Sequence, residues 1–243
     1  MLSVSQVVMS AIFCSSVCSA FNQSSFLLSD AMRLVKYCGA AYCTNPSFEN
    51  NQVEQWNCHA CKISPFVEAK LFSGLAADAN GFVGYEKHSN QIIVAFAGTE
   101  PTSKKNWIED FDFPLVDFNI CPKCKIHNGF YLTYLSVSKT IISLIDGFKT
   151  LHPTATISVT GHSLGAALAV ITIAELSANE QYSSSLTQTG HFVFGAPRVG
   201  NKDFFDWYSS KASLTYRFVH GKDPVPHVPF ESMHFHHVPY EVN

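Results

Sequence analysis

The sequence predicts an α/β fold with a mostly parallel central sheet and helices on both of its faces. Segments rich in β-branched residues alternate with helical segments, and no internal repeat or flexible linker divides the 243 residues. With 47% hydrophobic and 14% charged residues, the chain can bury one sizeable core. Ligand chemistry in such a sheet lies at the carboxyl ends of the strands.

The expected elements follow in order along the chain. Helical spacing predicts a first helix over residues 24–42, and residues 44–66 resemble loop. Residues 81–98 predict a β-hairpin that turns at His88–Asn90 and has a buried second strand. The rest of the pattern predicts a helix within 131–151, a strand at 156–161, a helix at 164–178 and strands at 191–200 and 214–221.

The first residues indicate a secretory signal peptide that ends at Ala20. Residues 1–29 carry no charged side chain, and residues 7–14 form an apolar stretch too short to span a bilayer. The lysine or arginine that usually begins such a signal is missing, so an ordinary N-terminal helix is the alternative. We expect residues 1–20 to be removed and residues 21–243 to form one secreted, extracellular domain without a permanent membrane anchor.

Cysteine usage fits an exported chain. Of eight cysteines, Cys14 and Cys18 would leave with the signal, and an even number remains. Two Cys-x-x-Cys pairs are predicted to form disulfides: Cys58 with Cys61, and Cys121 with Cys124. The alternative is a zinc site, but the gap between the pairs is far longer than in zinc knuckles.

The pairing of Cys38 and Cys43 stays open at this point. On an unbroken helix, residues five apart exceed the Cα–Cα reach of a disulfide. Either Gly39 breaks the helix or one thiol pairs elsewhere.

Ser163 lies between two glycines where the predicted strand gives way to the predicted helix. The segment Gly161-His-Ser-Leu-Gly165 has the spacing of a nucleophile elbow, a sharp turn that exposes a serine oxygen above the sheet. Glycines two positions either side allow the turn, and the helix N-terminus directs backbone N–H groups at a nearby oxyanion. A phosphate-binding loop or a plain turn is the alternative.

An activated serine needs a base and an acid downstream. Asp223 directly follows the strand predicted at 214–221 and precedes a stiff Pro-Val-Pro segment, whereas Asp203 and Asp206 fit a solvated helix face. The pattern does not choose a base among His234, His236 and His237. His-x-His-His would also suit a metal, but no metal or cofactor is expected. The net charge of −3 and the lack of a basic run give no sign of a nucleic-acid partner.

Taken together, these segments resemble the fungal-type, or class 3, lipases of the α/β-hydrolase fold. The resemblance runs from about Leu27 to Val242. It rests on motifs in order: AAYC (40–43), VAFAGTE (94–100), NWIEDFDF (106–113), CPKCKIHNGF (121–130), VTGHSLGAALA (159–169), FGAPRVGN (194–201), DPVPHVP (223–229) and HVPYEV (237–242).

The resemblance assigns roles to residues. It implies that Ser163 is the nucleophile, that Asp223 is the acid, and that Thr99 and Leu164 provide the oxyanion hole. The base in the family precedes the glutamate of a terminal His-x-x-x-Glu pattern by four residues, which selects His237.

The resemblance also implies a lid just after the oxyanion residue, at about 101–110. The lid residues would be Asn106, Trp107, Ile108 and Phe111; an ordinary core-facing helix is the alternative. Three features depart from the family pattern. Ala97 stands where an arginine is common, the chain stops at Asn243 where most members continue, and Cys43 lacks the tail cysteine with which it pairs in some members.

The resemblance implies a secreted serine ester hydrolase, a triacylglycerol lipase that acts on long-chain acylglycerols at an oil–water interface. Phospholipase A1 and feruloyl-type esterase are alternatives on the same scaffold. A catalytically inactive lipid-binding protein is an alternative of another class. The sequence does not indicate an oligomeric state.

Overall fold

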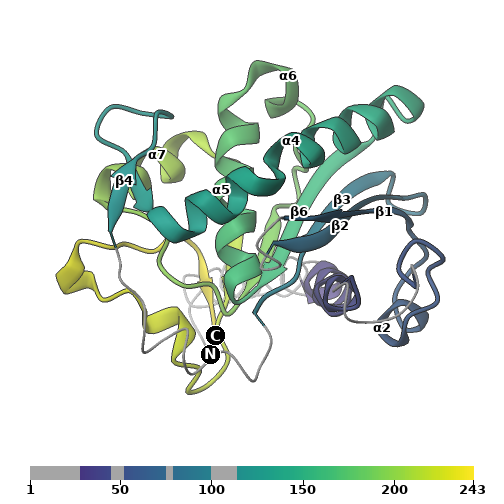
Figure 1. The fold of residues 1–243 in the computed structure, drawn as a ribbon, viewed down its shortest axis with the longest axis horizontal. Coiled ribbons are helices and arrows are strands. Elements are labelled where there is room, and N and C mark those ends of the chain that lie inside the picture. The colour runs from purple at the N-terminus through teal and green to yellow at the C-terminus, as the bar shows by residue number, and fades with distance from the viewer. Residues whose placement is uncertain (1–27, 45–51, 75–78, 100–113) are drawn as a thin grey trace, which may run out of the picture.

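The computed structural model describes residues 28–44, 52–74, 79–99 and 114–243. A seven-stranded sheet forms its centre, in the order β1-β2-β3-β6-β7-β8-β9 (Figure 1). The strands are β1 (Glu68–Ser73), β2 (Asn80–Glu86), β3 (Gln91–Phe96), β6 (Thr156–His162), β7 (His191–Phe194), β8 (Thr215–Phe218) and β9 (Glu241–Val242).

Pairing within the sheet confirms the predicted fold class. The pairs β3–β6, β6–β7, β7–β8 and β8–β9 are parallel, and β1–β2 and β2–β3 are antiparallel. The predicted hairpin, β2–β3, is therefore present, and together with β1 it forms the antiparallel part of an otherwise parallel sheet. As a result, β3, β6, β7 and β8 end at the same edge.

Helices cover both faces of the sheet (Figure 1). One face packs against the first described helix, residues 28–42, and the short α2 (His59–Lys62). The other face packs against α4 (Asn128–Leu151), α5 (Leu164–Ala178) and α7 (Lys202–Lys211), with α6 (Glu180–Ser183) beside α5. Residues 44–66 resembled loop in the sequence, but their described part includes α2.

Strand β3 shows how one strand serves two hydrophobic cores. Ile92 and Val94 belong to the core under α4 and α5, and Ile93 and Ala95 to the core under helix 28–42. All four side chains are buried, since successive residues of a strand point to opposite faces. A strand buried on both faces reads as a continuous apolar run.

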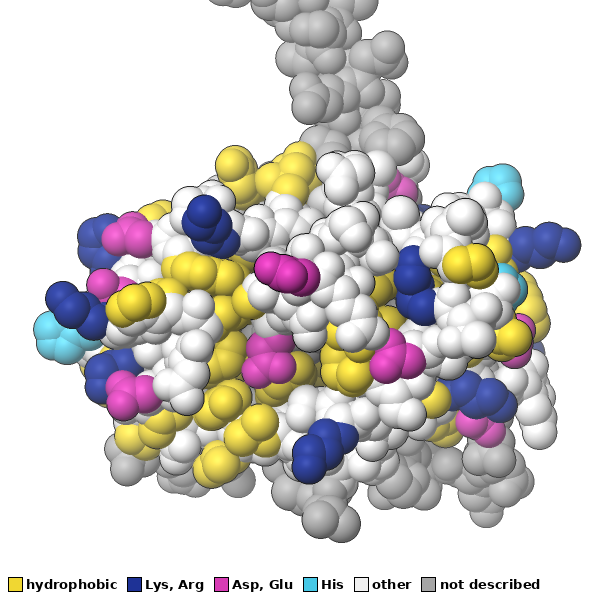
Figure 2. Space-filling view, turned by 90° about the horizontal axis from the view of Figure 1, so that it is seen from above, with side chains coloured by type: hydrophobic (Ala, Val, Ile, Leu, Met, Phe, Trp, Pro, Cys, Tyr) yellow, Lys and Arg dark blue, Asp and Glu magenta, His cyan; other side chains and the backbone are white. Residues whose placement is uncertain are grey.

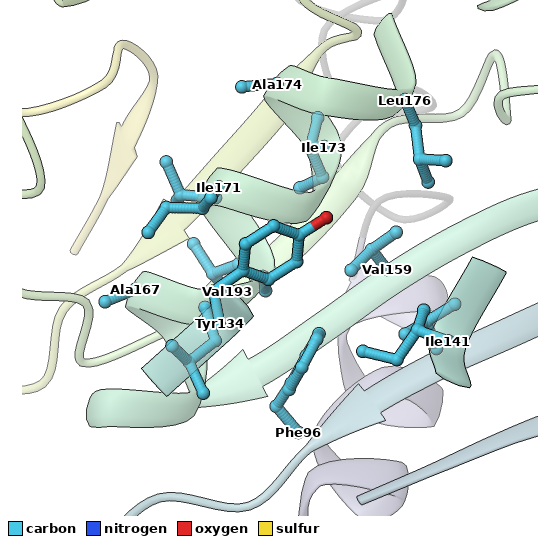
Figure 3. Packing of buried hydrophobic residues seen from close by; sticks show 14 of the residues in the cluster. Phe96, Tyr134, Ile141, Val159, Ala167, Ile171, Ile173, Ala174, Leu176 and Val193 are labelled. Atoms are coloured by element: carbon cyan, nitrogen blue, oxygen red, sulfur yellow. The ribbon is translucent and has the colours of Figure 1, made fainter. Parts of the chain in front are cut away.

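Helix α5 is buried almost all round. Figure 3 shows Ala167, Ile171 and Ile173 of α5 packed with Tyr134 of α4 and Val193 of β7. Small residues near its N-terminus let α5 approach the sheet closely. This packing fixes the position of the turn that precedes α5.

A second, two-stranded sheet consists of β4 (Leu115–Asp117) and β5 (Lys125–His127). The Cys121–Cys124 disulfide closes its connecting segment, with a Cα–Cα distance of 5.3 Å. Cys58 and Cys61 form the second disulfide, so both predicted pairs are confirmed. The four sulfur atoms are bonded in these two pairs, so none of them is a free thiolate that could bind zinc.

Cys38 and Cys43 are free thiols. The helix runs through Gly39 without a break, and the Cys38 Sγ lies 3.2 Å from the Thr160 hydroxyl in the core. Neither suggested pairing of these cysteines is therefore present among the described residues.

Figure 2 shows the face that lies over helices α4, α5 and α6. Basic and acidic side chains of the described residues are interspersed on this face, with hydrophobic side chains between them. Within the described ranges, no helix combines the length and apolarity of a membrane span.

Candidate active site

Ser163 occupies the turn between β6 and α5. Its backbone has φ 58° and ψ −124°, a conformation that costs a non-glycine residue about 1–3 kcal/mol and persists only where the surroundings impose it. The Ser163 N–H donates to the Phe194 carbonyl at 2.9 Å, and the Ser163 carbonyl accepts from Ala166 N–H in the first turn of α5. The serine is 2% exposed. This is the strained strand-to-helix geometry of a nucleophile elbow.

The flanking glycines permit the turn. A Cβ atom on Gly161 would collide with the Gly165 carbonyl oxygen, and one on Gly165 would lie 2.5 Å from the Ala97 carbonyl oxygen. Close backbone-to-backbone contacts are therefore the reason that these two positions have no side chain.

Leu164 directly follows Ser163, and Thr99 directly follows Gly98, which lies close to this turn. The segment that follows β3 lies against the elbow, since a Cβ on Gly98 would be 2.5 Å from the His162 carbonyl oxygen and 3.1 Å from Ser163 Cβ. Leu164 begins α5 directly after Ser163. The Thr99 hydroxyl is buried and has no hydrogen-bond partner among the described residues. Leu164 and the segment that contains Thr99 thus lie next to the serine, and their oxyanion role stays a prediction.

Asp223 follows β8, two strands away from β6. Its Oδ1 accepts the Val225 N–H at 3.0 Å, which holds the carboxylate at the start of the Pro-Val-Pro segment. Its Oδ2 lies 2.9 Å from the position of a Cβ on Gly195, which follows β7 and has φ +57°. The carboxylate therefore reaches back from β8 toward the end of β7, next to the elbow strand.

His162 is a residue of this site that sequence reasoning missed. Its Nδ1 lies 2.7 Å from the hydroxyl of Tyr42, at the end of helix 28–42. Its Nε2 lies 3.6 Å from the same Gly195 Cβ position that Asp223 approaches. The AAYC and GHSLG motifs contain both residues, but only the fold brings Tyr42 next to His162.

His237 lies between the last strand and the Pro-Val-Pro segment. Its Nε2 is 2.6 Å from the Pro226 carbonyl oxygen, and its buried Nδ1 has no hydrogen-bond partner among the described residues. Burial and the positive charges of Arg217 and Arg198 lower the pKa of His237 to about 3. Neither ring nitrogen is bonded to Ser163 or Asp223, so the described contacts do not join this imidazole to the other two predicted triad residues.

The buried Arg217 holds the chain around His237 in place. Its Nε donates to the Val238 carbonyl at 3.2 Å, and its guanidinium pairs with Glu241 at 2.7 Å. The glutamate that selected His237 in the sequence is thus an ion-pair partner of β8. The described residues include no group of three or more side chains suited to a metal, the His-x-His-His segment included.

A pocket of ≈ 670 Å³ is lined in part by Phe118, Tyr131 and Glu175 and is separate from the residues described above. Among the described residues, none of the predicted site residues lines it. The four predicted lid residues, Asn106, Trp107, Ile108 and Phe111, lie outside the described residues.

Comparison with known proteins identifies the family. Residues 93–233 match the family model described as Lipase (class 3). The chain belongs to the class 3 lipase family. The Rhizopus niveus lipase is 33% identical over 207 residues, which cover 83% of this chain and 51% of the relative. The secreted mono- and diacylglycerol lipase 1 of Fusarium solani is 28% identical over 204 residues, covering 83% and 59%.

A solved triacylglycerol lipase shares the fold. This triacylglycerol lipase, described as having a serine protease triad at its catalytic centre, superposes with a TM-score of 0.76 at 26% identity, covering 88% of this chain and 78% of that one. The α/β-hydrolase fold expected from the resemblance is therefore confirmed. The chain spans about half the length of the curated relatives that it matches.

Proposed function

We propose that this class 3 lipase family member is a secreted carboxylic-ester hydrolase that cleaves acylglycerols at an oil–water interface. The observation that carries the proposal is the strained backbone of Ser163 at the strand-to-helix turn. A buried serine in this conformation has its oxygen next to the N-terminus of α5, where backbone N–H groups favour a negative charge.

In the proposed reaction, the Ser163 oxygen attacks the ester carbonyl while a histidine takes its proton. The backbone N–H groups of Thr99 and Leu164 stabilise the tetrahedral oxyanion. One such donor lowers the activation free energy by about 3 kcal/mol. The histidine returns the proton to the leaving alcohol, and Asp223 stabilises the imidazolium. Water then hydrolyses the acyl-enzyme by the same steps and releases the fatty acid.

His237 stays our prediction for the base. Its Nε2 is engaged by the Pro226 carbonyl, so catalysis by His237 requires the ring to leave this contact. A rotation of the His237 ring by 180° about χ2 is one way to break this contact. The rotation keeps the ring in the same plane but exchanges the positions of Nε2 and Cε1 and those of Nδ1 and Cδ2. This requirement makes His237 the role in the proposal that most needs a direct test.

The substrate class rests on the relatives. They include a lipase, a secreted mono- and diacylglycerol lipase and a triacylglycerol lipase. The aromatic residues predicted in the lid favour long acyl chains. Hydrolysis rates on emulsified triolein, phosphatidylcholine and methyl ferulate, measured side by side, test this choice, and a preference for methyl ferulate or phosphatidylcholine would move the protein to the corresponding alternative.

A fluorophosphonate probe tests the nucleophile, because it labels only an activated serine. We expect labelling of the full chain and loss of both labelling and ester hydrolysis, by at least about a thousand-fold, in Ser163→Ala. Ser158→Ala is the matched control, since Ser158 is a buried serine of β6, the strand that ends directly before Ser163. Labelling that persists in Ser163→Ala, or a wild-type chain that neither labels nor hydrolyses, would contradict the proposal.

A second comparison tests the base. His237→Gln should abolish labelling and hydrolysis, whereas His236→Gln, a neighbouring half-buried histidine, should retain both. If His237→Gln is labelled at the wild-type rate, His237 is not the base while Ser163 remains the nucleophile.

A further inference from the structure

The motif FGAPRVGN (194–201) has no role in the proposed reaction, but its last residues are firmly bonded to neighbouring elements. The Val199 carbonyl accepts the His127 N–H at 2.9 Å, and the Asn201 N–H donates to the Lys125 carbonyl at 2.9 Å. Both partners lie in β5, and the Asn201 side chain caps α7. This segment is therefore fixed between the small sheet and a helix.

Arg198, within this segment, donates to three consecutive carbonyl groups. Its backbone N–H donates to the Val228 carbonyl at 2.9 Å. Its Nη1 donates to the His227 carbonyl at 2.7 Å and to the Pro229 carbonyl at 3.0 Å. The Arg198 side chain is only 12% exposed, so water competes little with these bonds. Since hydrogen bonds from a charged donor are stronger than neutral ones, one residue holds this stretch of backbone firmly.

The predicted acid lies at the other end of the turn that Arg198 holds. This turn is the 3₁₀ helix η1 (Val225–His227). At its start, the Val225 N–H donates to Asp223 Oδ1 at 3.0 Å. Because a 3₁₀ helix has three residues per turn, η1 is a single turn whose two ends move together. It joins the carbonyls that Arg198 binds to the N–H group that binds the carboxylate.

The predicted base contacts the same turn. The Pro226 carbonyl oxygen, in the middle of η1, lies 2.6 Å from His237 Nε2. The residue before the base is held by the FGAPRVGN segment as well, because the His236 N–H donates to the Gly200 carbonyl at 2.8 Å. Hydrogen bonds therefore lead from residues 198–200 to both the acid and the base.

We infer that Arg198 is a positioning residue that holds η1, so that Asp223 and His237 keep their places relative to each other. This inference rests on the proposed function, in which these two residues act together. Within the part of the chain that the structure describes, Arg198 bonds to neither of the two side chains and acts through the backbone between them. When His237 leaves Pro226 to act as the base, the bonds from Arg198 keep Asp223 in place to meet the imidazole.

Substitutions of Arg198 in the full chain test the inference on the soluble ester p-nitrophenyl butyrate. Arg198→Met keeps an unbranched side chain but has no donor for the His227 and Pro229 carbonyls. We expect it to lower kcat about 10- to 100-fold and to change KM less than about 2-fold, because a remote change that misplaces catalytic groups acts on the reaction step. Arg198→Lys keeps a charged group with several donors, and its kcat should stay within about 5-fold of the wild type.

Two control variants separate this role from other effects. Glu231 pairs with Arg198 Nη2 at 3.3 Å, but its side chain is 71% exposed and this pair does not involve the carbonyls of the turn. Glu231→Gln should therefore leave kcat unchanged. Arg33 is an arginine with 15% exposure that bonds to Glu86 and Gln91, at the end of the sheet remote from Ser163. Arg33→Met should lower the melting temperature without lowering kcat.

The melting temperature of each variant, and titration of its active serine with the fluorophosphonate probe, show how much folded enzyme is assayed. If Arg198→Met does not fold, Arg198→Gln takes its place, because its amide has a shorter reach than the guanidinium. We expect a lowered kcat and an unchanged KM in that variant also.

The outcomes are distinct. Wild-type kcat in Arg198→Met or Arg198→Gln, a lysine variant no more active than the methionine variant, or an equal loss of kcat in Arg33→Met would each overturn the inference. If the probe does not label Ser163 in the wild type, the proposed function fails. If Ser163 is labelled and the Arg198 variants match the wild type, only the role of Arg198 fails.

Discussion

The carbonyl oxygen of Ala97 lies 2.5 Å from the point that a Cβ atom on Gly165 would occupy. The end of β3 and the first turn of α5 thus meet backbone to backbone, with no room for even a methyl group. The same contact brings the segment after β3, with Thr99, next to Ser163. The oxyanion segment and the nucleophile are therefore positioned by one close approach.

Gly165→Ala should destabilise the protein and lower ester hydrolysis, because the added methyl pushes α5 away from β3. We expect a loss of about 2 kcal/mol in the free energy of unfolding, as for an overpacked core. Gly147→Ala is the matched control, since its Cβ would meet no atom within 4 Å on the exposed side of α4. It should stabilise the helix by about 1 kcal/mol. Urea unfolding of the two variants measures both effects, and a Gly165→Ala variant as stable as wild type would contradict the expected contact.

The ion pair between the buried Arg217 and the exposed Glu241 should matter more than a pair in which both side chains are exposed. The Arg217 side chain is 4% exposed, and Glu241→Ala leaves its charge without a counter-ion, at a cost of about 3 kcal/mol. Asp206→Ala removes the partner of Lys202 from an exposed pair on α7 and should cost no more than about 0.5 kcal/mol. Thermal unfolding of both variants measures the two losses of stability. Equal losses would show that the Arg217–Glu241 pair stabilises the protein no more than the exposed pair.

Buried histidines should make the fold sensitive to acid. Burial lowers the pKa of His191 to about 3, against 6.5 for a free histidine side chain, so between these pH values the unfolded state binds a proton that the folded state does not bind. Stability contributed by the neutral ring is complete above pH 6.5 and is lost as pH falls toward 3. Between pH 7 and 4.5 we expect a loss of about 2 kcal/mol from this group.

His191→Asn tests the acid effect, because its side-chain oxygen replaces the Nδ1 that accepts the Val159 N–H and does not titrate. The variant should lose less stability than wild type between pH 7 and 4.5 in urea unfolding. His88→Asn, in the exposed hairpin turn, is the control. The same slope for wild type and His191→Asn would rule out a contribution from His191.

The free thiols should differ in reactivity. Burial raises the pKa of Cys38 to about 12, whereas Cys43 is only partly buried. Iodoacetamide should therefore alkylate Cys43 in the native protein and Cys38 only after unfolding. Peptide mapping measures this, with the four disulfide-bonded cysteines modified only after reduction. Alkylation of Cys121 or Cys58 in the unreduced, unfolded protein would contradict the observed pairing.

Local pattern predicted the elements that surround the elbow. The hairpin, β6, α5 and both disulfides depend on short segments of four to twenty residues. Each segment contains all the residues that determine its local structure. Strands β1 and β9 and helix α2 were not predicted from the sequence, for different reasons. Strand β1 is an amphipathic edge strand with charged residues, β9 has only two residues, and α2 is a single turn closed by a disulfide.

Side-chain partners across the fold were harder to predict. Asp223 was chosen because it follows a strand, and its carboxylate lies beside Gly195 at the strand-end edge. The family resemblance selects His237 through its spacing to Glu241, but that glutamate pairs with Arg217, and the imidazole contacts Pro226. A spacing of four residues identifies a motif, whereas the direction of a ring depends on every group around it.

The sequence by itself determined the strand-to-helix turn at Ser163, because glycine spacing and strand and helix preference act between residues that are close along the chain. The tertiary structure alone decided which groups meet around that serine. Tyr42 and His162 are 120 positions apart, and they touch only because a helix on one face of the sheet ends where a strand ends. Contacts of that kind arise from the packing of whole elements, which no short segment encodes.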